Sequence, residues 1–272
     1  MVFILLNRED KHIEYIQTLP NIKMKIYLDN NIFIYLENGS LTLSDLEEAI
    51  NGKIDKIFYS ASHIQEALEI KGSTEEQRLE RINKRLNTIE NITKCNYLYE
   101  NLEHQTYELL KKPVIKIVTE VSFAQNAMKS LLNFVSDEQK EQTRNILNIE
   151  SSRINNYSPD EVVEHLNKKI LQAGQNFTFL GMIEKGISYH PDGKSFGLSN
   201  RIAAIFELLD MLGYWKDKSN EKSNYARLWD SSHTSFAANC DYFISDDKRT
   251  RNKAKVVYNI YGIKTKVISS KG

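Results

Sequence analysis

The chain has few cysteines and no long apolar runs. Its 272 residues include only 2 cysteines, Cys95 and Cys240, which lie far apart and outside any CxxC or Cys/His cluster. We therefore expect neither a zinc site nor a disulfide framework, as in proteins of the reducing cytoplasm. No apolar run approaches the roughly 20 residues that span a membrane. The opening MVFILL has no basic flank before it and no small-residue cleavage site after it, so it does not predict a signal peptide.

The sequence also lacks an excess of charge and is poor in proline and glycine. Lys plus Arg and Asp plus Glu both number 36, so any polyanionic partner must be held by local patches rather than by net charge. With 4 prolines, 11 glycines and 41% hydrophobic residues, the composition favours a largely helical chain with a sizeable core and a few short strands.

Apolar runs predict the strands. KIYL before Asp29, KIFYS at 56–60 and CDYFIS at 240–245 have the composition of buried parallel strands. KTKVIS at 264–269 alternates like an edge strand, and weaker strand patterns are NYLY at 96–99 and VIKIV at 114–118. Helical patterns separate these runs. The alternation predicts an α/β fold in which helices flank a central parallel sheet and ligands gather at the carboxyl ends of the strands.

Several polar residues predict helix ends. We expect Ser44, Ser62 and Asp230 as N-caps, the last of these for the pattern SSHTSFAANC. A final helix, KRTRNKAKVVYNIYG, should follow Asp247 and end at Gly262.

The middle of the chain has helical patterns without strands. SFAQNAMKSLLNFV, PDEVVEHLNKKILQAG and NRIAAIFELLDMLGYW have helical apolar spacing, and SNEKSN at 219–224 has the composition of a surface loop. We predict an N-terminal extension over 1–23, the first part of the α/β core over 24–118, a helical insertion over 119–225 and the second part of the core over 226–272. The natural start is either Met1 or Met24.

Four acidic residues stand where a parallel sheet would bring them together. Asp29 and Asp247 follow predicted strands, Glu66 lies on the helix after KIFYS, and Asp230 precedes the helical pattern SSHTSFAANC. Carboxylates that share a cleft raise one another's pKa and oppose folding unless a cation compensates them. Oxygen ligands without thiolates favour Mg²⁺ or Mn²⁺, which also bind phosphate oxygens. Hydrolysis of a phosphodiester is the matching chemistry.

Three motifs carry a resemblance to the PIN-like nucleases. LDNN at 28–31 resembles the first acid of that family, SASHIQEAL at 60–68 its second-acid helix, and DSSHTSFAANCDYFISDD at 230–247 its closing signature. The resemblance implies a Rossmann-like three-layer fold and a metal-dependent endoribonuclease, an activity often found in toxins or defence effectors.

The same resemblance implies roles for individual residues. Asp29, Glu66, Asp230 and Asp247 match the catalytic, metal-binding acids, with Asp246 as a rival metal ligand to Asp247. Asn31 matches the polar position beside the first acid, and Ser245 matches the hydroxyl position of the closing Ser/Thr-x-Asp signature.

Basic residues and histidines lie close to these acids in the sequence. Lys248, Arg249 and Arg251 follow the last acid and should contact the phosphates of RNA. His63 and His233 each lie three residues from a candidate acid, and we expect both to be hydrogen-bonded structural residues.

Two other functions stay open from the sequence. One is a noncatalytic PIN-like scaffold or regulator whose helical insertion binds a protein partner; that insertion could also form a homo-oligomer, gate the cleft or bind an inhibitory protein. The other is a different phosphotransfer enzyme. Against it, LDNN lacks the second Asp of haloacid-dehalogenase-like phosphatases, no adjacent acidic pair of the receiver type ends an early strand, and no Walker A or G-x-G-x-x-G motif is present.

Overall fold

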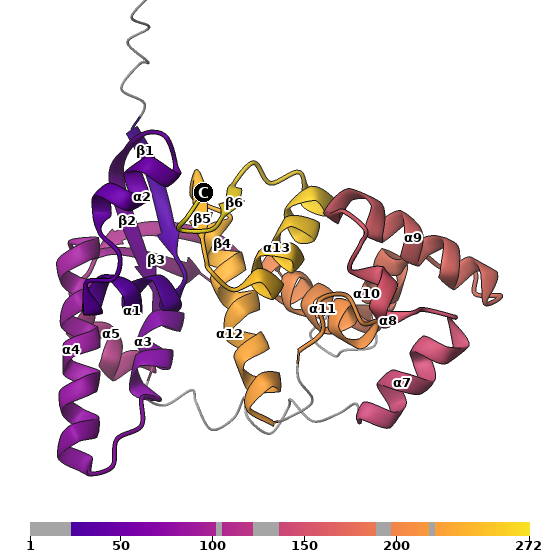
Figure 1. Cartoon of the computed structure of the whole chain (residues 1–272), viewed down its shortest axis with the longest axis horizontal. Coiled ribbons are helices and arrows are strands. Elements are labelled where there is room, and N and C mark those ends of the chain that lie inside the picture. Colours follow the sequence, from indigo (N-terminus) through magenta and orange to yellow (C-terminus); the bar gives the residue numbers. More distant parts are fainter. Residues whose placement is uncertain (1–22, 102–104, 122–135, 189–196, 218–220) are drawn as a thin grey trace, which may run out of the picture.

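A six-stranded sheet forms the centre of the molecule. The computed structural model describes residues 23–101, 105–121, 136–188, 197–217 and 221–272 (Figure 1). The strand order is β4-β3-β2-β1-β5-β6, and all neighbouring pairs are parallel except β3 and β4. The strands are β1 (Lys23–Leu28), β2 (Lys53–Ser60), β3 (Asn96–Asn101), β4 (Thr106–Lys111), β5 (Tyr242–Ile244) and β6 (Lys266–Ile268). The predicted α/β class, the three apolar strands and the edge position of the last strand are confirmed.

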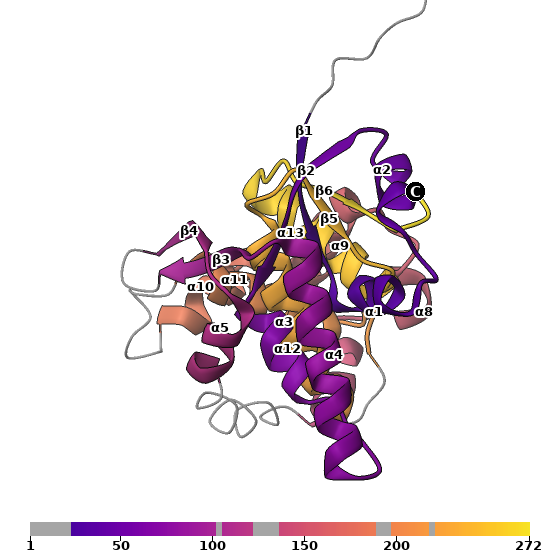
Figure 2. The same ribbon diagram turned by 90° about the vertical axis from the view of Figure 1, so that its left-hand side faces the viewer.

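Helices cover both faces of the sheet. The first group comprises α1 (Asn30–Asn38), α2 (Leu43–Ala49), α3 (Ala61–Leu68), α4 (Glu75–Thr93) and α5 (Val114–Val121). The second comprises α7 (Asp137–Ile146), α8 (Ser151–Ile154), α9 (Pro159–Gln172), α10 (Phe179–Ser188), α11 (Leu198–Met211), α12 (Glu221–Ala237) and α13 (Lys248–Tyr261). The two views place these groups on opposite sides of the strands (Figures 1 and 2). No helix within the described ranges is long and apolar enough to cross a membrane.

Alternation along β1 divides the core into two parts. Successive side chains of a strand point to opposite faces, so Ile26 and Leu28 pack with buried residues of the first helical group. Tyr27 points the other way and shares a core with residues from Leu147 to Tyr214, as well as with α12 and α13. Since burying one large apolar side chain stabilises by about 1.5–3 kcal/mol, the central helices and this face of the sheet stabilise each other.

The predicted boundaries of the insertion and extension are only partly within the described chain. Residues 1–22 and the helical pattern at 122–135 lie outside it, whereas Lys23 is already the first residue of β1. The patterns beginning at Pro159 and Asn200 do form helices, α9 and α11.

One weak strand prediction is wrong. Residues 114–118 belong to helix α5, where Val114, Ile117 and Val121 are buried at helical spacing. The strand in this region is β4, which pairs antiparallel with β3. Most of β4 is exposed, so it has no apolar run by which periodicity could reveal it.

The cap predictions are mostly wrong by about two residues. Helix α2 is capped by Thr42, which exchanges hydrogen bonds with Asp45 in a capping box. Helix α3 begins after Ser60, and the Ser62 hydroxyl instead lies 2.6 Å from that of Ser232. The prediction for α13 is confirmed, because the helix ends at Gly262 with φ +63°.

Asp230 lies inside α12 and is not its N-cap. The helix begins at Glu221, so residues 221–224 of the predicted surface loop also belong to it. Arg227 and Trp229 are buried immediately before Asp230. Tertiary packing therefore extends the helix upstream, through residues whose polar sequence suggested a loop.

Candidate active site

Asp29 lies at the carboxyl edge of the sheet, where β1 and β5 end side by side. Its backbone N–H donates to the carbonyl oxygen of Ile244 at 2.8 Å, and it is the N-cap of α1. The residue is only 5% exposed. It accepts hydrogen bonds from the Ser245 hydroxyl at 2.5 Å, the Asn31 amide at 2.7 Å and the Asn30 backbone N–H at 2.8 Å. Asn31 and Ser245 therefore fix the orientation of the Asp29 side chain.

The Asp29 carboxylate is held by neutral donors. Burial raises its pKa, and the nearby carboxylate of Glu66 raises it further; the charge of His233 and the hydrogen bonds from Ser245 and Asn30 oppose this. The net pKa of Asp29 is raised above its ordinary value. Its negative charge is thus incompletely compensated.

Asp230 approaches the same region from α12. Burial raises the pKa of Asp230 well above its ordinary value, and the charges of Asp29 and Asp247 raise it further. The charge of Lys253 opposes this shift. The fold therefore brings three acids that are far apart in sequence close enough to repel one another.

Glu66 joins this group through a histidine. Its carboxylate lies 2.9 Å from Nε2 of His233, whose Nδ1 lies 2.8 Å from the Tyr27 hydroxyl. His233 is fully buried; burial alone would lower its pKa, but Glu66 and Asp29 outweigh this effect and the pKa is raised. The contact with the imidazole thereby keeps the Glu66 carboxylate on the face of α3 that is turned toward the other acids. We call Asp29, Glu66, Asp230 and Asp247 the acid cluster.

His63 is a structural residue. The backbone N–H of Ser60 donates to its Nδ1 at 3.0 Å, so its Nε2 carries the proton and donates to the carbonyl oxygen of Leu28 at 2.7 Å. Burial and the neighbouring His233 lower the pKa of His63 well below its ordinary value. A neutral imidazole thus joins the end of β1 to the start of α3.

The adjacent acids Asp246 and Asp247 lie in different surroundings. Both carboxylate oxygens of Asp246 accept hydrogen bonds from Ser270, at 2.8 and 2.7 Å. Asp247 caps α13 by accepting from the backbone N–H of Arg249 at 2.7 Å, and its own N–H donates to Ser245 at 3.1 Å. Asp246 thus holds the C-terminal turn, while the charge of Asp247 acts on Asp230.

The three predicted RNA contacts differ as well. Lys248 is exposed, and its ammonium group lies over the Trp215 ring, 4.7 Å from the centroid. Arg249 is 43% exposed, with Nε 3.8 Å from Asp217. Arg251 donates to the carbonyl oxygen of Ser245 at 2.7 Å. This hydrogen bond stabilises the loop after β5.

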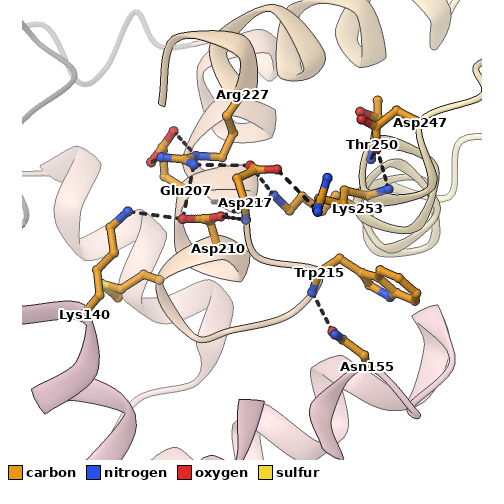
Figure 3. Close-up of polar contacts among 12 residues, drawn as sticks. Lys140, Asn155, Glu207, Asp210, Trp215, Asp217, Arg227, Asp247, Thr250 and Lys253 are labelled. Atoms are coloured by element: carbon orange, nitrogen blue, oxygen red, sulfur yellow. Dashed lines mark hydrogen bonds and ion pairs between the residues drawn. The ribbon is translucent and has the colours of Figure 1, made fainter. Parts of the chain in front are cut away.

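Sequence reasoning missed a buried ion network next to the acid cluster (Figure 3). Arg227, at the centre, is 2% exposed and forms ion pairs with Glu207 at 2.8 Å, Asp210 at 3.2 Å and Asp217 at 3.3 Å. Lys253, also 2% exposed, lies 3.1 Å from Asp217 and 3.6 Å from Asp210. We call this set the ion network; its members are Lys140, Glu207, Asp210, Asp217, Arg227 and Lys253. Asp210 had one detectable signal, its position inside the apolar pattern FELLDML.

The donor set of the acid cluster suits a hard divalent cation. It offers carboxylate oxygens and no thiolate. Among the described residues, no three His, Cys, Asp or Glu side chains already form a metal-binding group. Mg²⁺ commonly retains several waters and needs only one or two carboxylates, so the chemistry of the donors fits the ion without a preformed cage.

Comparisons with known proteins give no relative to guide the assignment. No family model, curated protein or solved structure matches the chain significantly. The geometry of the acid cluster and the resemblance of the three motifs are therefore the basis for a functional proposal.

Proposed function

We propose that this chain is a metal-dependent endoribonuclease with a PIN-like fold. The observation that carries the proposal is the meeting of Asp29, Asp230 and Asp247 at the carboxyl edge of the sheet, where their charges raise the pKa of Asp230. None of the three forms an ion pair with a Lys or Arg within the described ranges. Such a surplus of negative charge destabilises the free protein and is useful where a cation binds.

The residues of this chain have distinct tasks in the proposed reaction. Asp29, Asp230 and Asp247 would hold Mg²⁺ or Mn²⁺, with Glu66 at the side of the site nearest His233. Ser245 and Asn31 orient Asp29 through their hydrogen bonds. A bound ion would supply activation of water and stabilisation of the leaving oxygen. RNA as the substrate, and a role as toxin or defence effector, come from the family resemblance.

Substitutions at the acids test the activity directly. Asp29→Asn and Asp247→Asn should each lower cleavage of RNA in Mg²⁺ or Mn²⁺ by at least about 100-fold. Both residues are helix N-caps, and Asn caps about as well as Asp, so folding should be preserved. Gel assays of a labelled RNA, with urea unfolding of each variant, make the measurement.

The neighbouring acid provides the matched control. Asp246→Asn should retain most of the activity, because Asp246 is bonded to Ser270. Equal cleavage by the wild type and Asp29→Asn would refute the assignment of Asp29. A wild-type protein that binds neither ion and cleaves no RNA would favour the noncatalytic scaffold instead.

A further inference from the structure

An open cleft adjoins the acid cluster between the central helices and α13. Its volume is about 550 Å³, and its lining includes Trp215 and Lys216 from the segment after α11 together with Asp247, Lys248 and Arg249. Lys216 and Lys248 are exposed. The cleft therefore combines an aromatic ring, three cationic side chains and two acids, Asp246 and Asp247.

The fold holds Trp215 at this position by specific backbone contacts. Trp215 has φ +46°, a left-handed conformation that is uncommon for a bulky residue. Its backbone N–H donates to the Asn155 side chain at 2.6 Å, which ties the turn to the residue after α8 (Figure 3). The preceding Tyr214 is fully buried, whereas Trp215 remains partly exposed. Strained backbone of this kind is concentrated at functional sites.

The cations around the ring are available to a phosphate. The Lys248 ammonium lies over the indole at 4.7 Å and has no carboxylate partner among the described residues. Among the residues that the structure describes, the Arg249 guanidinium forms an ion pair only with Asp217, at 3.8 Å, and the Arg249 side chain is 43% exposed. A ligand that offers both a flat ring and an anionic group would satisfy the indole and the cations together.

We propose that this cleft binds one unpaired nucleotide of single-stranded nucleic acid. The base stacks on the indole of Trp215, and the adjoining phosphate is held by Lys248 and Arg249. Base–aromatic stacking is stronger than an exposed cation–π contact, so Lys248 moves from the ring to the phosphate on binding. Paired bases are already stacked within a duplex, which excludes them from this cleft. The inference deepens the proposed function, because Asp247 lies in the same cleft and the strand would continue toward the acid cluster.

Intrinsic fluorescence tests the stacking. The chain contains 2 tryptophans, so Trp229→Phe leaves Trp215 as the single indole, and Trp215→Phe leaves the buried Trp229 as a matched control. In EDTA, a single-stranded 12-nucleotide oligouridylate should quench the first variant and leave the second unchanged. The same measurement with the matching deoxyribose oligomer shows whether the 2′-hydroxyl contributes to binding. Quenching of neither variant, or of both equally, would overturn the proposal.

Affinity measurements test the contribution of the base. Trp215→Leu should weaken oligonucleotide binding about 5- to 140-fold, the cost of losing one stacked base, and Trp215→Phe should retain most of the affinity. Two further probes, a duplex and a single strand with abasic sites, cannot stack a base on Trp215. The wild type should bind each of them no more tightly than Trp215→Leu binds the intact single strand. Equal affinity of the wild type for abasic and intact strands would refute stacking, even if Trp215→Leu folds poorly.

The outcome is separable from that of the nuclease assay. Quenching of Trp215 without RNA cleavage would support the nucleotide cleft and count against the proposed enzyme. Cleavage without quenching or base-dependent affinity would do the reverse.

Discussion

The acid cluster and the ion network lie side by side but are balanced differently. In the ion network, three carboxylates meet three cations, with Arg227 and Lys253 almost fully buried. In the acid cluster, Asp29 is held by neutral amide and hydroxyl donors, and Glu66 lies 2.9 Å from Nε2 of His233, an imidazole whose pKa its carboxylate neighbours raise. The first arrangement has the composition of a structural element, whereas in the second no Lys or Arg within the described ranges forms an ion pair with Asp29, Asp230 or Asp247.

The pKa shifts of Asp210 and Asp230 show the consequence. Burial alone would raise the pKa of Asp210, but the charges of Lys253 and Arg227 outweigh it and the pKa is lowered. Burial also raises the pKa of Asp230, and there the charges of Asp29 and Asp247 raise it further. The same residue type thus stabilises the fold in one cluster and destabilises it in the other. Proteins commonly accept such a loss of stability where function requires it.

The largest expected effect comes from breaking the ion network. Arg227→Met should lower the free energy of unfolding by about 3–5 kcal/mol, because it leaves Asp210 and Asp217 without their guanidinium partner. Urea unfolding provides the measurement. Arg153→Met, which removes an exposed pair with Glu150, should cost less than about 1 kcal/mol. Similar losses in both variants would show that burial does not distinguish the two pairs.

A pair of Asp→Asn substitutions should change stability in opposite directions. Asp210→Asn should destabilise by about 1–3 kcal/mol, because it weakens hydrogen bonds to charged partners. Asp230→Asn should stabilise the metal-free protein by about 0.5–2 kcal/mol, because it removes the repulsion from Asp29 and Asp247. The same sign for both variants would contradict the comparison.

The pH dependence of these two differences should also be opposite. The pKa of Asp210 is lowered by folding, so its stabilising effect is present above the unfolded-chain value of about 3.9 and is lost as the pH falls through the folded value. The pKa of Asp230 is raised, so its penalty is absent below about 3.9 and grows as the pH rises through the folded value. Unfolding curves of wild type and variants from pH 3 to pH 8, on the order of one per pH unit, resolve both trends.

Much of the fold could be predicted because its central strands are buried on both faces. The runs ending at Leu28, Ser60 and Ile244 are apolar for that reason, and their order places Asp29 and Ser245 side by side. The exposed β4 and the upstream half of α12 depend on pairing and packing with distant segments. Local sequence gives no sign of either, so both were missed.

The site was less predictable, because its chemistry depends on partners that are distant in sequence. The local sequence shows that Asp29, Ser245 and Asp247 lie at or after the ends of predicted strands. The surroundings that separate Asp246 from Asp247 involve Ser270 and Ser245, which only the folded chain brings near. Lys253 belongs to the predicted helix KRTRNKAKVVYNIYG, whose local sequence does not show that this side chain is buried against Asp217.

The smallest expected effect is the one that connects the acid cluster to its proposed ligand. Mn²⁺ at ten times its dissociation constant should stabilise the wild type by about 1.4 kcal/mol, a rise in melting temperature of about 2–4 °C. Asp230→Asn starts from a more stable metal-free state and loses a ligand, so its rise should be smaller, whereas Asp246→Asn should show the full rise. Differential scanning fluorimetry with and without Mn²⁺ compares the three proteins. An equal rise in all of them would place the ion outside the acid cluster, and the imbalance of charge there would then need a different explanation.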